Sequence, residues 1–396
     1  MALPLIERKK LVRIYSPYLP TPITEGAFHV IHYQKKALEE LNFRVELVHW
    51  KSKSSESYLK KIKRVGQSFF TEFASPETFY YSLTDDPARA GLAIADYGIY
   101  HFSLCYPWLK YNRPRPEKKT IVHFHNIESN LFALRKQKDR FSSPGSSMIH
   151  GMNESKLRAH EASLAGLADE LWFLSQVDQE EYQSRLAPGQ PSVKTRVIGP
   201  TADPVVRIKR RDQFLKRLPQ LQEQPLCAGT LGRFDFEPNR ASLEWIIREL
   251  APLLSKRGFS GKIQVAGPGV PNELKKAAAS FPFIELLGFV EDLESFWSNL
   301  TFVLVPQKGG SGVRIKLLEA LASGIPTLAH SSAVAPLDPR LRTCPFLLTS
   351  DTPEEWAEQL IGEHPGKTRA LHVDRPLEPA LLGADVYRFL IADFNS

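Results

Sequence analysis

TFVLVPQKGGSGVRIKLLEALASGIPTLA, residues 301–329, is the most informative stretch of this chain. Its pattern predicts an apolar strand over 301–306, a glycine-rich turn over 309–312, a helix over 313–322 and a second strand after the Gly-Ile-Pro that follows. In such a unit the backbone N–H groups of the helix N-terminus and the positive end of the helix dipole face the turn. That arrangement favours binding of a phosphate group.

Two charged residues of the predicted helix strengthen this interpretation. Lys316 and Glu319 are three positions apart on one helical face. A lysine near the positive dipole end is unfavourable unless an anion is close, so Lys316 could neutralise a pyrophosphate. Glu319 could accept hydrogen bonds from ribose hydroxyls. The alternative is a simple ion pair between the two side chains.

The turn itself predicts close contact with a ligand, because glycine permits positive φ and close approach of the backbone. Arg314 is expected to point to solvent or towards the other domain, and it remains a candidate ligand. The predicted ligand-binding residues of this turn and helix are Gly310, Ser311, Gly312, Val313, Arg314 and Glu319.

The bulk properties fit a globular protein of two domains. The chain has 396 residues, of which 42% are hydrophobic and 24% charged. It has no apolar stretch of the ~20 residues that span a bilayer, and charges interrupt the N-terminal apolar residues of 1–16 too early for a secretory signal. Three separated cysteines fit a reducing compartment. We therefore expect a cytoplasmic protein, either free or peripheral on the inner face of the membrane.

The net charge of +7 has two interpretations. It either favours binding of anionic ligands, anionic lipid or nucleic acid, or it serves solubility alone.

Residues 58–73, YLKKIKRVGQSFFTEF, predict a basic amphipathic helix. Such a helix either lies on an anionic membrane or packs on the sheet with its charged face in water. Nucleic-acid binding would need a concentrated basic stripe with exposed aromatic residues, which only 51–64 approaches. We expect no nucleic-acid partner.

Strand and helix patterns alternate along the chain, which predicts parallel sheets with right-handed crossovers. Residues 188–225, rich in Pro, Gly and charge, predict an interdomain connection. In the first half, strands are predicted at 11–15, 44–50, 99–104, 120–125 and 170–175, and helices at 27–41 and about 150–168. In the second half, strands are predicted at 226–231, 262–266, 283–287, 301–305, 327–329 and 346–349, and helices near 239–256, 271–280, 292–299, 313–322 and 353–362.

We therefore predict an α/β protein with two doubly wound, Rossmann-like domains that face a cleft. The expected divisions are an N-terminal Rossmann-like domain over 1–200, a C-terminal Rossmann-like domain over 201–378 and a closing helix over 379–396. Ligands of such sheets bind beyond the carboxyl ends of the strands, which is where the turn at 309–312 follows its strand.

The second half resembles the retaining glycosyltransferases of family 4, which have the GT-B fold. LGRFDFEPN (231–239) is similar to the family's strand and Gly-Arg loop, and IQVAGPG (263–269) to its Val-x-Gly-x-Gly turn. LLGFVEDLESFW (286–297) resembles the segment near the base, and GGSGVRIKLLEALASGIP (309–326) the donor diphosphate loop and helix. Each motif is weak alone, but the four occur together in the family's order.

The first half resembles the family less closely. SPYLPTPITEGAFHV (16–30) is similar to the first loop, although only Gly26 stands where the family usually has a glycine pair. HFHNIES (123–129) resembles the His-Asn-x-Glu-Ser variant at the end of a central strand, and LWFLSQVDQEEY (171–182) a further common stretch. Gly26 is therefore a predicted donor-binding residue.

Two positions depart from the family pattern. The usual motif has two Glu residues separated by seven others; Glu319 fits the second, but Ser311 occupies the first. This puts the identity of the sugar in doubt. Asn239 replaces a common phosphate-binding lysine, for which Lys316 or Arg314 could compensate.

The resemblance implies retaining transfer of a sugar from a UDP- or GDP-linked donor to a glycan, lipid-linked or small-molecule acceptor. It places the nucleotide sugar on the domain over 201–378 and the acceptor on the side of the domain over 1–200. Arg233 and Lys316 would bind the diphosphate and stabilise the leaving group, and His125 would hydrogen-bond the donor sugar. These three are the predicted catalytic residues. His123 is expected on the other face of its strand, and Glu128 either positions the acceptor or caps the next segment.

We expect no metal and no other cofactor, because no Asp-x-Asp pair follows a strand convincingly. The rival hypothesis is a non-catalytic protein of the same fold that binds a nucleotide or a partner chain. Ser311 and the single Gly26 favour that rival.

Overall fold

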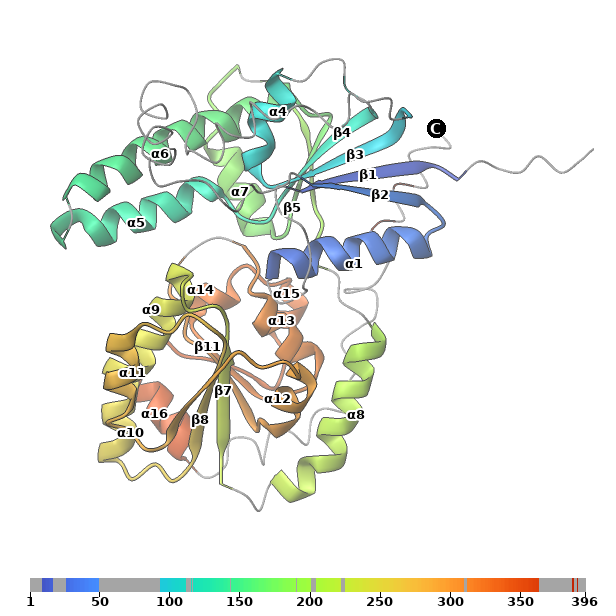
Figure 1. Cartoon of the computed structure of the whole chain (residues 1–396). Coiled ribbons are helices and arrows are strands. Elements are labelled where there is room, and N and C mark those ends of the chain that lie inside the picture. Colours follow the sequence, from blue (N-terminus) through green and yellow to red (C-terminus); the bar gives the residue numbers. More distant parts are fainter. Residues whose placement is uncertain are drawn as a thin grey trace, which may run out of the picture. The chain divides into compact units, whose positions relative to one another are not determined.

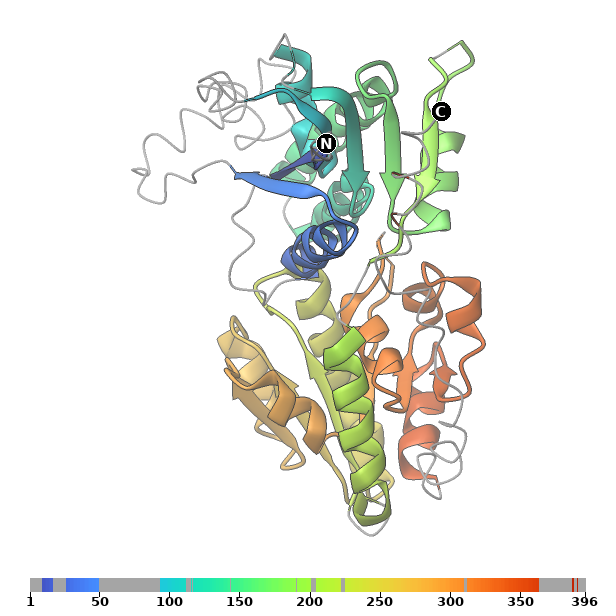
Figure 2. The ribbon, with the colours of Figure 1, turned by 90° about the vertical axis from the view of Figure 1, so that its right-hand side faces the viewer.

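The chain divides into two compact units that each contain a parallel sheet with helices on its faces (Figures 1 and 2). The N-terminal unit comprises residues 1–201 with 384–396, and the C-terminal unit comprises 202–383. This computed structural model describes residues 9–16, 26–49, 93–111, 115, 117–142, 144–189, 191–200, 204–221, 225–309, 312–362, 387 and 390.

The described strands of the N-terminal unit form a parallel sheet in the order β2-β1-β3-β4-β5-β6. The strands are β1 (Leu11–Ser16), β2 (Arg44–His49), β3 (Ala95–His101), β4 (Glu117–Phe124), β5 (Glu170–Phe173) and β6 (Lys194–Val197). The described helices include α1 (Gly26–Glu40), α4 (Tyr106–Tyr111), α5 (Glu128–Ser142), α6 (Pro144–Ser163) and α7 (Gln176–Ser184).

The C-terminal unit has a second parallel sheet, in the order β12-β11-β10-β7-β8-β9. This is the doubly wound order, and it reverses between β7 and β10, where such folds bind their ligands. Its strands are β7 (Cys227–Leu231), β8 (Lys262–Ala266), β9 (Ile284–Gly288), β10 (Phe302–Val305), β11 (Thr327–Ala329) and β12 (Leu347–Thr349). Its described helices are α8 (Pro204–Leu221), α9 (Glu237–Trp245), a π-helical turn (Ile246–Leu250), α10 (Ala251–Lys256), α11 (Asn272–Ala278), α12 (Leu293–Asn299), α13 (Ile315–Ala322), α14 (Ser331–Val334), α15 (Pro339–Arg342) and α16 (Pro353–Ile361).

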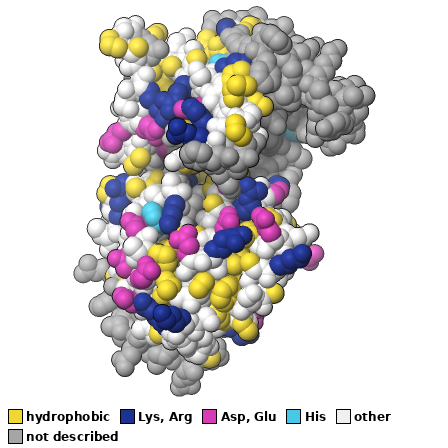
Figure 3. Space-filling model, turned by 90° about the vertical axis from the view of Figure 1, so that its left-hand side faces the viewer, with side chains coloured by type: hydrophobic (Ala, Val, Ile, Leu, Met, Phe, Trp, Pro, Cys, Tyr) yellow, Lys and Arg dark blue, Asp and Glu magenta, His cyan; other side chains and the backbone are white. Residues whose placement is uncertain are grey.

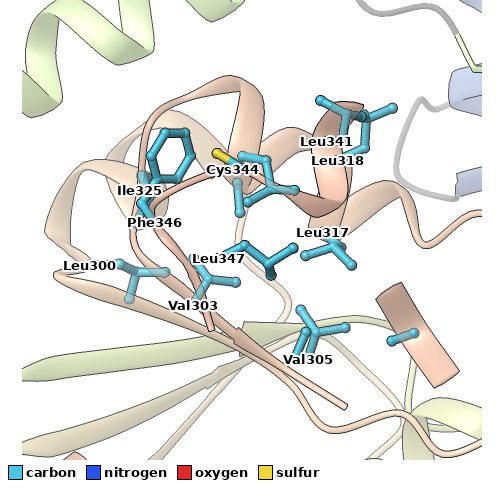
Figure 4. Close-up of a cluster of buried hydrophobic side chains, with 14 of the residues drawn as sticks. Leu300, Val303, Val305, Leu317, Leu318, Ile325, Leu341, Cys344, Phe346 and Leu347 are labelled. Carbon is cyan, nitrogen blue, oxygen red and sulfur yellow. The ribbon is translucent and has the colours of Figure 1, made fainter. Parts of the chain in front are cut away.

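The side-chain alternation of β10 divides the core of this unit in two. Phe302 and Leu304 pack among residues of α9, α10, α11 and α16. Val303 and Val305 point to the other face, where Leu317 of α13 packs against them (Figure 4). Because α13 is apolar on the side facing β10, its burial fixes the position of its N-terminus at the carboxyl edge of the sheet.

Sequence patterns located most strands of both sheets, and the predicted interdomain connection over 188–225 contains the boundary between the two units, at 201/202. This segment is nevertheless not irregular throughout. It contains β6 and the 18-residue helix α8. Pro204 is the first residue of α8, a position where the missing N–H of proline removes no helical hydrogen bond. The strand predicted at 99–104 is also displaced, because β3 ends at His101 and Phe102 has a positive φ of 69°.

The N-terminal half holds a further difference. The helix predicted over about 150–168 is the later part of α6, which begins at Pro144, and α5 was not predicted at all.

The predicted closing helix lies mostly outside the described residues. Two residues of it, Tyr387 and Leu390, are buried in the core of the N-terminal unit, against Trp172 and other side chains. The end of the chain therefore contributes to the first unit.

None of the helices in the described part of the chain is both long and apolar enough to cross a membrane. The amphipathic segment 58–73 lies outside the described residues. On the face shown in Figure 3, Lys and Arg side chains are interspersed with Asp and Glu.

Gly267 provides a test of the packing at the edge of the second sheet. Its φ is +134°, and a Cβ there would lie 1.9 Å from the carbonyl oxygen of Gly232. Gly267→Ala is expected to lower the free energy of unfolding by at least ~2 kcal/mol, because only backbone movement relieves that clash. Urea unfolding of the full chain measures the change.

The control is Gly145→Ala, since a Cβ at Gly145 meets no atom within 4 Å. It should change the stability by no more than ~0.5 kcal/mol. Equal effects of the two substitutions would contradict the packing described.

Candidate functional site

The loop after β7 and the loop after β8 pack together at the reversal point of the second sheet. Gly232 N–H donates to the Ala266 carbonyl at 3.0 Å, and Phe234 N–H donates to the Pro268 carbonyl at 2.9 Å. These contacts hold Arg233 between two anchored residues. The Arg233 side chain is 48% exposed, and its Nε lies 3.1 Å from Asp235. The guanidinium lowers the pKa of the Asp235 carboxyl.

Lys316 is the second residue of α13, and its side chain reaches across to the loop after β7. Its Nζ donates to the Asn239 side-chain oxygen at 3.1 Å, and the Asn239 amide nitrogen donates to the Arg233 carbonyl at 3.0 Å. Asn239 therefore links the two predicted cationic residues. Burial, and next the charge of Arg314, lower the Lys316 pKa to about 7. Within the described residues, the ammonium has no carboxylate partner.

Arg314 holds the glycine-rich loop from inside. It is 9% exposed, and its two terminal nitrogens donate to the carbonyls of Gly309 (2.6 Å) and Gly312 (3.0 Å). The expectation that Arg314 points to solvent is therefore wrong, because two carbonyls of its own loop accept hydrogen bonds from its guanidinium. Gly309 N–H donates to the Ser332 hydroxyl at 2.9 Å, which fixes the other side of the loop.

The structure describes some of the other predicted ligand-binding residues. Gly312 is buried with a φ of +84°, which requires glycine, and Val313 packs against the core of the unit. Gly310 and Ser311 lie outside the described residues. Gly26 begins α1 in the N-terminal unit.

Glu319 lies one turn along α13 from Lys316, but the two do not pair. The Glu319 carboxylate is 3.8 Å from a terminal nitrogen of Arg210 on α8. Arg210 also forms a two-point ion pair with Glu294, in which Nε lies 2.8 and 2.9 Å from the two carboxylate oxygens. The simple ion pair considered as an alternative for Lys316 is therefore not made. Sequence reasoning missed Arg210, because α8 had been interpreted as a connection.

A cluster of imidazoles lies at the carboxyl edge of the first sheet. His125 follows the last residue of β4, and its Nε2 is 2.7 Å from Nδ1 of His101, the last residue of β3. His123 is the Cα partner of His101 in the β3–β4 register. The prediction that His123 lies on the other face is wrong, since residues two apart in a strand share a face.

His101 and Gln34 were missed as members of this cluster. The signal for His101 was present, because the carboxyl ends of adjacent parallel strands meet at one edge of a sheet. Gln34 lies in the middle of α1, and nothing in its spacing indicates a polar role.

Glu128 is a second buried acid–base candidate near the end of β4. Its carboxyl accepts a hydrogen bond from the Asn126 amide at 2.6 Å. Burial, and next the charge of Glu161, raise the pKa of Glu128 to about 8. It is therefore largely protonated at neutral pH, at the first position of α5.

The two sheet edges carry different chemistry. The second sheet presents Lys316 and Arg233 beside an anchored glycine loop, a combination suited to a diphosphate. The first presents neutral imidazoles and a carboxyl group, which suit hydroxyl groups.

Comparison with known proteins gives one family match and several similar solved structures. The family described as "Glycosyl transferases group 1" matches residues 225–362, within the C-terminal unit. A search of curated proteins found no match.

Solved structures match nearly the whole chain. A structure of Anabaena HepE in complex with UDP-glucose is 13% identical, with 97% of this chain and 100% of that chain covered and a TM-score of 0.59. Sucrose-phosphate synthase from Thermosynechococcus elongatus is 12% identical, with 98% of each chain covered and a TM-score of 0.63. The trehalose 6-phosphate synthase of Burkholderia multivorans is also 12% identical, with 98% of each chain covered and a TM-score of 0.64.

The fold is GT-B. The predicted α/β class is confirmed, with two parallel sheets flanked by helices as in these glycosyltransferase structures. At these identities the likeness establishes the fold, and the sequence match adds a glycosyltransferase-like C-terminal unit.

The environment of Lys316 predicts how stability depends on pH. Its folded-state pKa of about 7 lies below the ~10.4 of an unfolded chain, so between these values the unfolded state binds one more proton. The contribution of Lys316 to the free energy of unfolding therefore rises as pH rises above about 7. Lys316→Met removes a disfavoured buried charge and should stabilise the chain most at low pH.

Urea unfolding of wild type and Lys316→Met between about pH 6.5 and 9.5 tests this, because their difference cancels other titrating groups. The advantage of the variant should shrink towards the high end of that range. An advantage that is constant with pH would contradict the shifted pKa.

Proposed function

We propose that this protein is a glycosyltransferase that moves a sugar from a nucleotide-diphosphate sugar to an acceptor hydroxyl with retention of anomeric configuration. The observation that carries the proposal is the Lys316 ammonium beside Asn239 at the sheet reversal point, paired with no carboxylate among the described residues. The family match over 225–362 supports the reaction class. HepE, which shares the fold, has been solved with UDP and with UDP-glucose.

The C-terminal unit would bind the donor. The diphosphate would lie between the glycine loop at 309–312 and Arg233, with the protonated Lys316 adding a further positive charge. Glu319, oriented by Arg210, would accept the ribose hydroxyls. Positive groups fixed at the leaving diphosphate stabilise charge that develops as the glycosidic bond breaks.

The N-terminal unit would contribute the sugar-facing groups. His125 would hydrogen-bond the donor sugar, and Glu128 would position the acceptor. The donor would be a UDP- or GDP-linked sugar, and the acceptor would be a carbohydrate or a lipid-linked glycan. Cationic side chains would neutralise the diphosphate without a metal ion. Gly26 and the residues at Gly310–Val313 would contact the donor through their backbones.

Donor binding provides the first test, and UDP-glucose is the better probe because the terminal phosphate of UDP titrates near pH ~6. Calorimetry should show that the affinity for UDP-glucose falls as pH rises above about 7, as Lys316 loses its proton. Lys316→Met should bind at least ~10-fold more weakly, with little dependence on pH. GDP-glucose is measured in parallel to distinguish the two bases.

The control variant is Lys275→Met, which changes an exposed lysine of α11 in the same unit. It should bind as the wild type does. Donor binding without hydrolysis or transfer to any acceptor would favour the non-catalytic rival. Transfer with an inverted product, read from the anomeric coupling in proton NMR, would contradict retention.

A further inference from the structure

Gln34 connects all three imidazoles at the edge of the first sheet. Its amide oxygen is 2.7 Å from His101 Nε2, and its amide nitrogen is 3.1 Å from His123 Nδ1. The other nitrogen of His101, Nδ1, is 2.7 Å from His125 Nε2. Gln34, His101 and His123 are completely buried, and His125 is 5% exposed.

With the Gln34 amide in this orientation, the contacts define which ring nitrogen carries each proton. An amide oxygen only accepts, so His101 Nε2 must donate to it. In a neutral ring the other nitrogen is then an acceptor, so His101 Nδ1 accepts from His125 Nε2–H. The same reasoning leaves His125 Nδ1 with a lone pair and, among the described residues, no hydrogen-bond partner.

Burial keeps the three rings neutral, because it disfavours the charged form of each imidazole. Burial lowers the pKa of His123 to about 3, and burial followed by the neighbouring imidazoles lowers the pKa of His101 and His125 well below the usual value. In a neutral cluster the tautomer, rather than the charge, decides what each ring offers a ligand.

The C-terminal segment supports the orientation of the Gln34 amide. Gln34 Nε2 also donates to the Tyr387 hydroxyl at 3.1 Å. Tyr387 is 1% exposed and its ring lies 6.0 Å from that of Trp172. In this orientation the amide nitrogen meets Tyr387 Oη and His123 Nδ1, and the amide oxygen meets His101 Nε2.

We propose that Gln34 and His101 are positioning residues that hold His125 as the Nε2–H tautomer, so that its Nδ1 accepts a hydrogen bond from a hydroxyl of a bound sugar. The role at the sugar rests on the proposed function, whereas the tautomers do not. His125 then acts at the sugar as an acceptor and cannot donate from Nδ1. Neither Gln34 nor His101 needs to touch the substrate.

Long-range proton–nitrogen NMR of the ¹⁵N-histidine-labelled full chain reads these tautomers directly, without a ligand. At neutral pH, His101, His123 and His125 should each be protonated on Nε2. His125 protonated on Nδ1 would overturn the proposal. The three signals are assigned by single His→Asn substitutions.

Gln34→Glu is the sharper variant, since it keeps the acceptor facing His101 and replaces the donor facing His123 with a second acceptor. In this variant His123 Nδ1 should carry a proton, because it would donate to the new carboxylate oxygen, while His125 keeps its Nε2 proton. Gln34→Leu, which removes both contacts, should leave the imidazole protons of the cluster exchanging faster with water. An unchanged His123 in Gln34→Glu would overturn the amide orientation on which the inference depends.

Turnover of UDP-glucose, as hydrolysis or transfer, separates positioning from folding. His101→Leu and Gln34→Leu should lower kcat by about 10- to 100-fold, the effect of losing one orienting hydrogen bond at a reacting group, with unchanged affinity for UDP. Gln183→Leu, a surface control whose amide contacts Thr195, should behave as the wild type. Unchanged kcat in both cluster variants would overturn the positioning role.

The two proposals can fail separately. If the wild type neither binds nor turns over UDP-glucose or GDP-glucose, the proposed function fails, whereas the NMR result still decides the tautomers. If turnover is normal and His125 carries its proton on Nδ1, only the positioning inference fails.

Discussion

The pairing of the Lys316 ammonium with an amide rather than a carboxylate is the constraint on which this account depends. The Asn239 oxygen accepts its hydrogen bond at 3.1 Å but does not neutralise it. Charging a partly buried lysine that has no counter-ion costs free energy, and for this reason the pKa of Lys316 is lowered to about 7. Under the proposed function, a bound diphosphate would supply the counter-charge and so offset that cost.

The backbone around Lys316 is built so that this group stays in place. Leu317 packs on β10, Arg314 holds the two loop carbonyls, and Gly267 lets the loops after β7 and β8 approach closely. None of these three residues needs to touch a ligand. They fix the groups that would, which agrees with the general need for a preorganised site.

Sequence patterns predicted most of the strands and the α13 unit, because hydrophobic periodicity and glycine spacing are local properties. The roles of Arg233, Lys316 and Glu319 at a ligand stay predictions. They could not predict the contact of Arg210 with Glu319, which is 109 positions away, and the prolines and charges of α8 had hidden that helix. They also could not predict the contacts of Gln34 with His123 and Tyr387, which are 89 and 353 positions away. The expectation for Arg314 failed for a similar reason, since carbonyls of its own loop became its acceptors only after folding. The match to 225–362 and the likeness to GT-B structures confirmed the coarse assignment and left the donor and acceptor as proposals.

Hydrogen–deuterium exchange of the full chain with and without saturating UDP-glucose tests the central claim most directly. The account predicts slower exchange in peptides covering 231–240 and 309–318, where Asn239 and Lys316 meet, and no change in the α6 peptide 144–163. Saturated binding that leaves both of the first two peptides unprotected would contradict the claim that this edge of the second sheet holds the diphosphate.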